Sequence, residues 1–359
     1  MTSMQLIKRF ANNKIANSLN LTVEDIQRCL ARWSEPHRFY HGLNHLFTLI
    51  DNIDEFDKHD IIHFNDEDKE LLDIIALFHD LVYDPRSKTN EVDSAQAFSA
   101  CISKSCESSE IINQVILDTE YGKWCEPSSE ISKMFRLFDW EIPLYRSSMY
   151  DLITAEKQIY REYQYVTHEE YVKNRVDFIE FAMDKASDNT ESDLLLELKV
   201  WVEHYRPKIG VYAGSFNPFH TGHLNILEQA ERVFDKVIIL AAKNSDKNGV
   251  TYEDAVEEIL PFHEVVGYRG LTTNYLNGVR DYADVTLIRG LRNGYDLQYE
   301  ANLRRFMEEI GEVDVMYFLS GLAYQHISSS DIRGLHKLSE SDYNRYIPTK
   351  YSYYTKSEE

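Results

Sequence analysis

Residues 209–223 read IGVYAGSFNPFHTGH, and this stretch decides how the second half of the chain folds. The short apolar run at its start ends in Gly214, which is typical of a buried strand that enters a loop. The loop then runs into HLNILEQAERVF, whose apolar spacing predicts a helix. Turns of this kind lie at the carboxyl ends of parallel strands, where α/β sheets bind nucleotides and a helix start favours phosphate. The stretch therefore predicts an α/β domain with a phosphate-binding turn.

Strand-like and helical segments alternate beyond this turn. The runs KVIILAA, DVTLIRG and VDVMYFL predict further strands, and the segments TYEDAVEEIL and LQYEANLRRFMEEI predict helices between them. This alternation is typical of crossover units on a parallel sheet. We therefore predict an α/β domain with a parallel sheet over residues 206–359.

The first half reads as one helix after another, with few prolines and no sustained alternation of apolar and polar residues. Arg206-Pro207-Lys208 follows it, and proline cannot continue a helix. A chain of 359 residues is also long for one core, because single cores stop growing at roughly 250 to 300 residues. We therefore predict two domains, with an all-α domain over residues 1–205.

The composition narrows the classes of function. A formal net charge of −22 disfavours nucleic acid as a partner, because binding it requires clustered cations. No apolar run approaches the roughly 18 to 20 residues of a membrane span, and the N-terminus lacks a secretory signal, so we expect a soluble cytoplasmic protein. The four cysteines show no metal-binding spacing and are expected to be reduced. The oligomeric state stays open, with a homo-oligomer possible.

The turn carries side chains suited to phosphoryl chemistry. Gly214 and Gly222 allow close backbone approach, and His220 and His223 can donate hydrogen bonds to charge on a transferring phosphoryl group. Much later, QHISSSDIR places hydroxyl groups at a helix start, at Ser328 to Ser330. Taken singly, a histidine beside glycine is usually a loop residue and a serine run is usually a helix cap. Their joint occurrence in an α/β pattern favours a nucleotide site.

These motifs resemble the nucleotidylyltransferase superfamily, whose mark is a Gly-Ser/Thr-Phe…His-x-Gly-His loop followed by an Ile-Ser-Ser-Ser/Thr turn. Between them, IRGLRNGYDLQYE at residues 288–300 resembles phosphopantetheine adenylyltransferases. The resemblance implies a Rossmann-like domain that binds ATP with Mg²⁺. It also implies transfer of an adenylyl group to a small phosphorylated acceptor, with release of pyrophosphate.

The same resemblance implies roles for individual residues. His223 would stabilise the transition state beside His220, while Ser215 and Lys247 would orient the acceptor and the α-phosphate. Lys247 and Arg289 would also grip the acceptor phosphate. The residues expected to bind nucleotide or phosphate are Gly214, Ser215, Phe216, His223, Arg289, Gly290, Arg292, Glu300, Ser328, Ser329 and Ser330.

Departures from the family pattern concern the acceptor. Phe306-Met307-Glu308 stands where phosphopantetheine enzymes have Met-Asn-Arg, and an arginine expected after Lys247 is replaced near Ala255. His220 is a threonine in many of those enzymes. A phosphopantetheine-like acceptor is expected, and nicotinamide mononucleotide is the alternative.

The first half carries a second constellation. YHGLNH at residues 40–45 places His41 and His45 four residues apart, which predicts one helix face. IALFHDLVYDP places His79 and Asp80 inside an apolar helix, where ionisable groups are costly unless paired or metal-bound. Asp139 in RLFDW adds a further acid. Imidazoles mixed with carboxylates suit a divalent transition metal.

These residues, with NEVDSA at 90–95 and a looser match at 161–163, resemble the HD superfamily of metal-dependent phosphohydrolases over about residues 25–185. The resemblance implies one Mn, Fe, Zn or Ni ion and a proton donor at His41. Gly122 stands in place of a family histidine, which favours a single metal. The implied ligands are His45, His79, Asp80 and Asp139. We therefore predict a bifunctional enzyme; the alternative is a transferase fused to a non-catalytic domain that senses nucleotide or mediates assembly.

Overall fold

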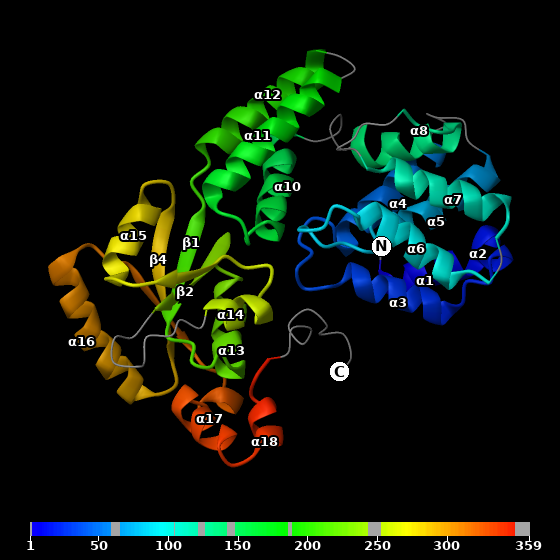
Figure 1. Cartoon of the computed structure of the whole chain (residues 1–359). Coiled ribbons are helices and arrows are strands. Elements are labelled where there is room, and N and C mark those ends of the chain that lie inside the picture. The colour runs from blue at the N-terminus through cyan, green and yellow to red at the C-terminus, as the bar shows by residue number, and fades with distance from the viewer. Residues whose placement is uncertain are drawn as a thin grey trace. The chain divides into compact units, whose positions relative to one another are not determined.

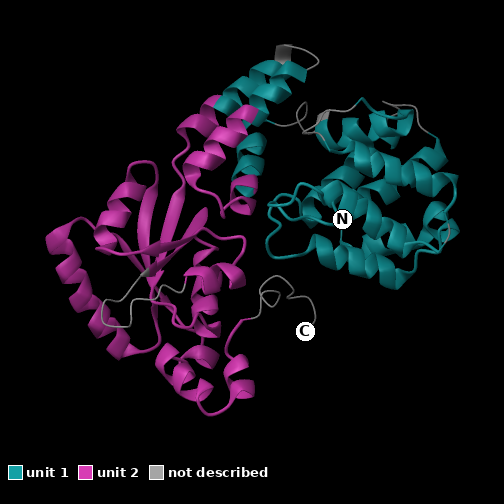
Figure 2. Ribbon diagram, in the orientation of Figure 1, with its two compact units in different colours: residues 1–158, 178–199, 357–359 teal, residues 159–177, 200–356 magenta. Residues whose placement is uncertain are grey.

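The computed structural model describes residues 2–58, 65–103, 105–120, 126–141, 148–185, 189–242 and 253–348 (Figure 1). Lys247 and Gly122, both discussed above, lie outside these ranges. Within them, no helix has the length and apolar character needed to span a membrane. The chain forms two compact units, one of residues 1–158 with 178–199 and the other of residues 159–177 with 200–356 (Figure 2).

The described part of residues 1–141 is helical, as predicted. Eight consecutive residues of α5, Leu71–Phe78, are buried, and a helix that is apolar on all sides lies inside a core. Capping boxes at Thr22 and Asn65 fix the starts of α3 and α5. The helices are α1 (Ser3–Asn12), α2 (Lys14–Ser18), α3 (Val23–Trp33), α4 (Leu43–Lys58), α5 (Asp66–Phe78), α6 (Asn90–Cys101), α7 (Glu107–Asp118), α8 (Glu130–Arg136) and a π-helical turn (Leu137–Glu141).

Three further helices precede the sheet: α10 (Met149–Glu162), α11 (His168–Lys185) and α12 (Asn189–His204). Each of them crosses the division between the compact units, since residues 159–177 and 200–204 group with the second unit. The compact units are thus not divided at the predicted boundary of residues 205/206.

The second unit contains the predicted parallel sheet, in the order β3-β2-β1-β4-β5. Alternate residues of β1 enter different cores, with Val211 in one and Tyr212 in the other, so both faces of the sheet are covered. The chain order reverses between β1 and β4, and the crevice at the carboxyl ends of such strands is where α/β sheets bind ligands. The strands are β1 (Lys208–Gly214), β2 (Lys236–Ala242), β3 (Val265–Tyr268), β4 (Asp284–Leu291) and β5 (Val315–Leu319).

The helices of this unit follow the strands. Residues of α13 and α14 pack in the core that contains Tyr212, and residues of α15 pack in the core that contains Val211. They are α13 (Thr221–Ala230), α14 (Glu253–Ile259), α15 (Thr272–Arg280), α16 (Gly294–Ile310), α17 (Ser329–His336) and α18 (Glu340–Asn344) (Figure 1).

The segment between α10 and α11 forms hydrogen bonds with residues at the amino-terminal ends of β2 and β3. The main-chain oxygen of Gln164 accepts from the Glu264 amide at 3.1 Å, and its side-chain Oε1 accepts from the Val237 amide at 3.3 Å. The buried Lys236 ammonium donates to the carbonyl of Val166 and pairs with Glu264 at 2.5 Å. These contacts explain why residues that read as part of the all-α half group with the α/β unit.

Removing this segment is expected to destabilise the α/β unit. A fragment of residues 206–359 should melt roughly 5 °C or more below a fragment of residues 148–359, because each lost internal hydrogen bond costs about 0.5 to 1.5 kcal/mol. Thermal denaturation followed by circular dichroism measures the difference. The longer fragment with Gln164→Leu should melt between the two. Equal midpoints for both fragments would show that the segment is dispensable.

Candidate nucleotide site and candidate metal centre

The loop after β1 is shaped by close packing. Phe216 is buried with a φ of 42°, and a Cβ added at Gly214 would lie 2.9 Å from its ring. Only glycine fits at position 214 without displacing the ring. A Cβ at Gly290 would likewise lie 2.8 Å from Ile226 of α13, so this glycine is required for packing of β4 on that helix. Because the Phe216 ring belongs to the core, only its main chain can meet a phosphate.

His220 and His223 cap the start of α13 reciprocally. Nδ1 of His220 accepts from the His223 amide and Nδ1 of His223 accepts from the His220 amide, both at 3.3 Å. The two rings stack with centroids 3.6 Å apart. Since each Nδ1 is an acceptor, each neutral ring carries its proton on Nε2. Both histidines are therefore arranged to donate from Nε2.

The charge state of this pair is set by burial. Burial and the nearby Arg292 lower the pKa of His220 to about 4, and burial together with His220 lowers the pKa of His223 well below its ordinary value. Both rings are thus neutral at pH 7. A neutral imidazole can still donate a hydrogen bond to charge that develops on a phosphoryl oxygen.

Acidification from pH 7.0 to 5.5 is expected to destabilise the second unit. Unfolded histidine binds a proton near pH 6.5, whereas folded His220 does so only near pH 4, so the unfolded state binds more protons between these values. The free energy of unfolding then falls with falling pH, by up to ~1.4 kcal/mol per pH unit per such histidine. Urea unfolding at the two pH values measures the loss. His220→Asn should show a smaller loss than the natural sequence, and an equal loss in both would contradict the assignment.

Arg289 and Arg292 lie at the edge of the sheet from which the loop after β1 leaves. Arg289 donates to the carbonyl of Ala213 in β1 at 2.9 Å and pairs with Glu300 of α16 at 2.9 Å. Arg292 forms a bidentate pair with Asp296 at 2.9 and 3.0 Å. The arginines predicted to bind phosphate are therefore positioned by carboxylates of α16. Glu300, predicted to hold ATP, is one of these partners.

The serine turn meets the first loop. Ser328 caps α17 by accepting from the Asp331 amide, and Ser329 donates to the carbonyl of Pro218 at 3.3 Å. Arg333 donates to the carbonyl of Asn217 and, at 3.0 Å, to the hydroxyl of Ser330. The arginines and the serine turn, which follow the first loop by about 70 and 110 residues in sequence, thus converge with it on one edge. Lys247 cannot be placed among the described residues.

Sequence reasoning assigned no role to Asp296 or Arg333, although both lie inside the quoted motifs. The signal for Asp296 was its spacing of four residues from Arg292, which brings two charges together on adjoining helical turns. Arg333 follows the serines by one helical turn, and nothing in that spacing indicates its contact with Asn217.

The predicted metal ligands of the first unit come together. Nε2 of His45 lies 3.1 Å from a carboxylate oxygen of Asp139, and Nε2 of His79 lies 3.2 Å from Asp80 and 3.7 Å from Asp139. One ligand atom from each of His45, His79 and Asp80 lies within 4.8 Å of the others. Two imidazoles and two carboxylates thus surround one point, which is the donor set of a mixed N/O metal site.

Two local predictions about this cluster were wrong. His41 does not share a helix face with His45, because α4 begins only at Leu43 and His41 lies in the preceding turn. His79 and Asp80 are not inside a helix either, because α5 ends at Phe78 and they form the turn after it. Spacing alone could not show these ends, because each depends on contacts with distant segments.

The electrostatics of the cluster fit a cation. Although burial opposes ionisation, the pKa of Asp80 and of Asp139 is held below the usual range by the neighbouring His79. Against the effect of burial, the two carboxylates raise the pKa of His79 to about 9. Nδ1 of His79 contacts the carbonyl of Ala76 at 3.0 Å, while its buried Nε2 makes no well-formed hydrogen bond. A carbonyl on Nδ1 would keep a proton on that nitrogen and orient the ring so that a metal could replace the proton on Nε2.

His41 lies beside the cluster without joining it. Its ring stacks on Tyr83 with centroids 4.4 Å apart and lies edge-on to His45 at 6.1 Å. It also contributes to the lowered pKa of Asp80. This placement agrees with a proton donor and not with a ligand.

Comparison with known proteins identifies the second half. Residues 211–335 match the cytidylyltransferase-like family. The phosphopantetheine adenylyltransferase of Geotalea daltonii is 36% identical over 142 residues, which cover 37% of this chain and 85% of that protein. That of Streptococcus sanguinis is 37% identical over 147 residues, which cover 39% of this chain and 89% of that protein. Through its C-terminal domain, the chain belongs to the phosphopantetheine adenylyltransferase family.

Proposed function

We propose that the C-terminal domain transfers the adenylyl group of ATP to the phosphate of phosphopantetheine and releases pyrophosphate. The observation that carries this proposal is the identity of 36 to 37% over 85 to 89% of two phosphopantetheine adenylyltransferases. The convergence of the histidine loop, the arginines of β4 and the serine turn on one sheet edge supports it.

The reaction requires no covalent intermediate with the enzyme. An oxygen of the acceptor phosphate attacks the α-phosphorus of ATP in line, and the bond to the β-phosphate oxygen breaks to release pyrophosphate. Positioning and charge neutralisation carry the rate of such a step. The Nε2 protons of His220 and His223 are available to the charge on the transferring group, and Arg292 with Ser328 to Ser330 would hold the phosphates. Mg²⁺ bound with ATP would neutralise further charge.

The departures from the family pattern bear on the acceptor. Met307 packs against the core under α15, and Glu308 is paired with Arg304 at 2.8 Å, which offsets its charge. A neutralised carboxylate gives little reason to prefer a cationic nicotinamide ring. Ala255 lines a cavity of about 460 Å³ together with Arg333 and Lys337, so positive charge near this departure comes from α17. These contacts favour phosphopantetheine over nicotinamide mononucleotide.

An acceptor screen tests this proposal. The full chain is incubated with Mg·ATP and, separately, phosphopantetheine, nicotinamide mononucleotide, nicotinate mononucleotide or glycerol phosphate, and pyrophosphate is measured. We expect the fastest release with phosphopantetheine, roughly tenfold or more above nicotinamide mononucleotide, since pocket contacts discriminate by about 10- to 200-fold. Pantetheine without its phosphate is the control and should give none. Release with neither named acceptor would overturn the acceptor while leaving adenylyl transfer open.

We further propose that the N-terminal unit is a phosphohydrolase that holds one divalent transition metal, Mn, Fe, Zn or Ni. The observation that favours it is the convergence of His45, His79, Asp80 and Asp139, with imidazole nitrogens 3.1 to 3.7 Å from carboxylate oxygens. A metal bound there would act as an electrophile toward a phosphoryl oxygen. His41, whose ring lies beside His45 and stacks on Tyr83, would give its proton to the leaving oxygen.

Metal analysis separates this function from a sensing or assembly role. The full chain, purified without chelator, should contain close to one equivalent of transition metal and should hydrolyse a generic phosphomonoester. A protein that neither carries nor takes up metal, and that hydrolyses nothing, would support the non-catalytic alternative.

A further inference from the structure

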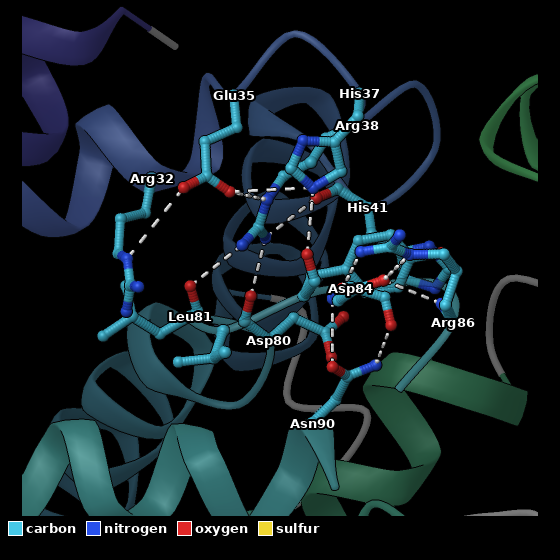
Figure 3. A network of polar contacts seen from close by, with 12 residues as sticks. Arg32, Glu35, His37, Arg38, His41, Asp80, Leu81, Asp84, Arg86 and Asn90 are labelled. Carbon is cyan, nitrogen blue, oxygen red and sulfur yellow. Dashed lines mark hydrogen bonds and ion pairs between the residues drawn. The ribbon is translucent and has the colours of Figure 1, made fainter. Parts of the chain in front are cut away.

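The Arg38 side chain is completely buried, and its guanidinium forms hydrogen bonds with two separate segments of the first unit. It donates to the carbonyls of Asp80 at 2.7 Å and Leu81 at 2.9 Å, and to the carbonyl of His41 at 3.3 Å (Figure 3). Its Nε donates to Glu35 at 3.1 Å, which supplies the compensating charge. One side chain thus ties the loop before α4 to the turn after α5.

This turn is the end of the helix that supplies His79. The carbonyls beyond a helix end lack intrahelical partners, and a cation at that end is favoured by the helix dipole. Arg38 takes two of these carbonyls, and Nε2 of His37 contacts a third, that of Tyr83, at 2.9 Å (Figure 3). The backbone that carries His79 and Asp80 is therefore held from the loop that carries His41.

A second set of contacts connects Arg38 to the imidazoles themselves. The guanidinium lies 5.6 Å from the Trp33 ring, and that ring lies 5.5 Å from His79 and 6.2 Å from His45. The indole is itself fixed, because it donates to the carbonyl of Leu77 at 2.9 Å. Displacement of Arg38 would thus release the turn and remove one of the contacts of the ring that packs against the two histidines.

We propose that Arg38 is a positioning residue for the metal centre: it sets the backbone of Asp80 and His41 and through them the geometry of the ligands. The inference rests on the proposed metal-dependent function of the first unit. Lysine cannot substitute for it, because an ammonium is a point donor that cannot span three carbonyls and a carboxylate in one plane. Groups that orient metal ligands typically change metal affinity by roughly 10- to 100-fold when they are removed.

The test compares the buried Arg38 with Arg9, a partly buried arginine of the same unit. Arg38→Lys is expected to weaken Zn²⁺ or Mn²⁺ binding by roughly 10- to 100-fold in calorimetric titration of the full chain. Arg9→Lys is the matched control, because Arg9 is also tied to two carboxylates, Asp54 and Asp73, but contacts no residue of the cluster. It should lower the melting temperature and leave metal affinity within about twofold.

Each outcome decides a different question. Failure of the natural sequence to bind either metal would defeat the proposed metal centre itself. Metal binding by the natural sequence with equal affinity in Arg38→Lys would overturn the inference while leaving the centre intact. If Arg38→Lys does not fold, Glu35→Gln decides, because it removes the charge that pairs with Arg38 at 3.1 Å, and the other ion-pair distances of Glu35, to Arg32 and His37, are longer, at 4.0 and 3.8 Å. That variant should bind metal several-fold more weakly, and unchanged affinity would defeat the positioning role.

Discussion

Replacing His223 by alanine is expected to lower ATP-dependent pyrophosphate release by roughly 10²- to 10³-fold, as for the loss of one donor to a developing oxyanion. The Nε2–H of this buried neutral ring contributes most when charge builds up on the phosphoryl group, so ATP binding should change little. Release is measured at saturating Mg·ATP and phosphopantetheine, and ATP affinity by calorimetry. Unaltered turnover would defeat the assignment of the site.

Two further variants distinguish a loss of catalytic rate from a loss of stability in this experiment. Because Nδ1 of His223 also accepts from the His220 amide, alanine removes a cap worth about 1 kcal/mol. His223→Asn offers an acceptor near the same place and should recover stability without recovering rate. His263→Asn is the control at a distance, since this buried histidine pairs with Glu231 at 2.7 Å. It should lose stability and keep its turnover.

Replacing Asp80 by asparagine is expected to remove the metal from the first unit. The side chain keeps its size but loses the charge that pairs with His79 at 3.2 Å. Removing a group that orients a ligand lowers metal affinity by roughly 10- to 100-fold, and removing a direct ligand should have a larger effect. Metal affinity and hydrolysis should therefore fall by about 10²-fold or more. Elemental analysis and a phosphomonoester assay measure both.

Asp73→Asn is the matched control for this change. Asp73 is a buried carboxylate of α5 that pairs with Arg9 at 2.7 Å, so its loss disturbs the same helix without touching the cluster. The control should be less stable and should still bind metal. If Asp80→Asn retained a full equivalent of metal, the cluster would be an internal ion-pair network, and a non-catalytic domain would become the better reading.

The fold was predictable where the pattern is local. Apolar runs marked β1, β2, β4 and β5, and those of β1 and β2 are continuous because these central strands are buried on both faces. The four-residue β3 has no such run, since Gly267 and its neighbours are only partly buried, and it was missed. The grouping of residues 159–177 with the second compact unit has another origin. Gln164 bonds to Val237 and Val166 bonds to Lys236, each across about 70 residues, and no periodicity in the sequence indicates these contacts.

The candidate sites were predictable as sets of residues but not as geometry. Motif order identified His223, Arg292 and the serine turn, and the structure brings these together. The tautomers of the histidine pair depend on two backbone amides, and the turn at His79 depends on Arg38; neither can be read from spacing. Lys247 stays a prediction.

The reciprocal cap at the start of α13 has a consequence for which amino acids selection retains at its two positions. Active-site residues commonly cost stability, which creates a trade-off between activity and robustness under selection. Here each imidazole divides its two nitrogens, with Nδ1 closing the helix end and Nε2 left for substrate. Selection for thermal robustness alone should therefore favour side chains with a hydrogen-bond acceptor at positions 220 and 223, histidine among them. A library randomised at these two positions, and sorted only by resistance to heat, should be depleted of side chains that lack such an acceptor.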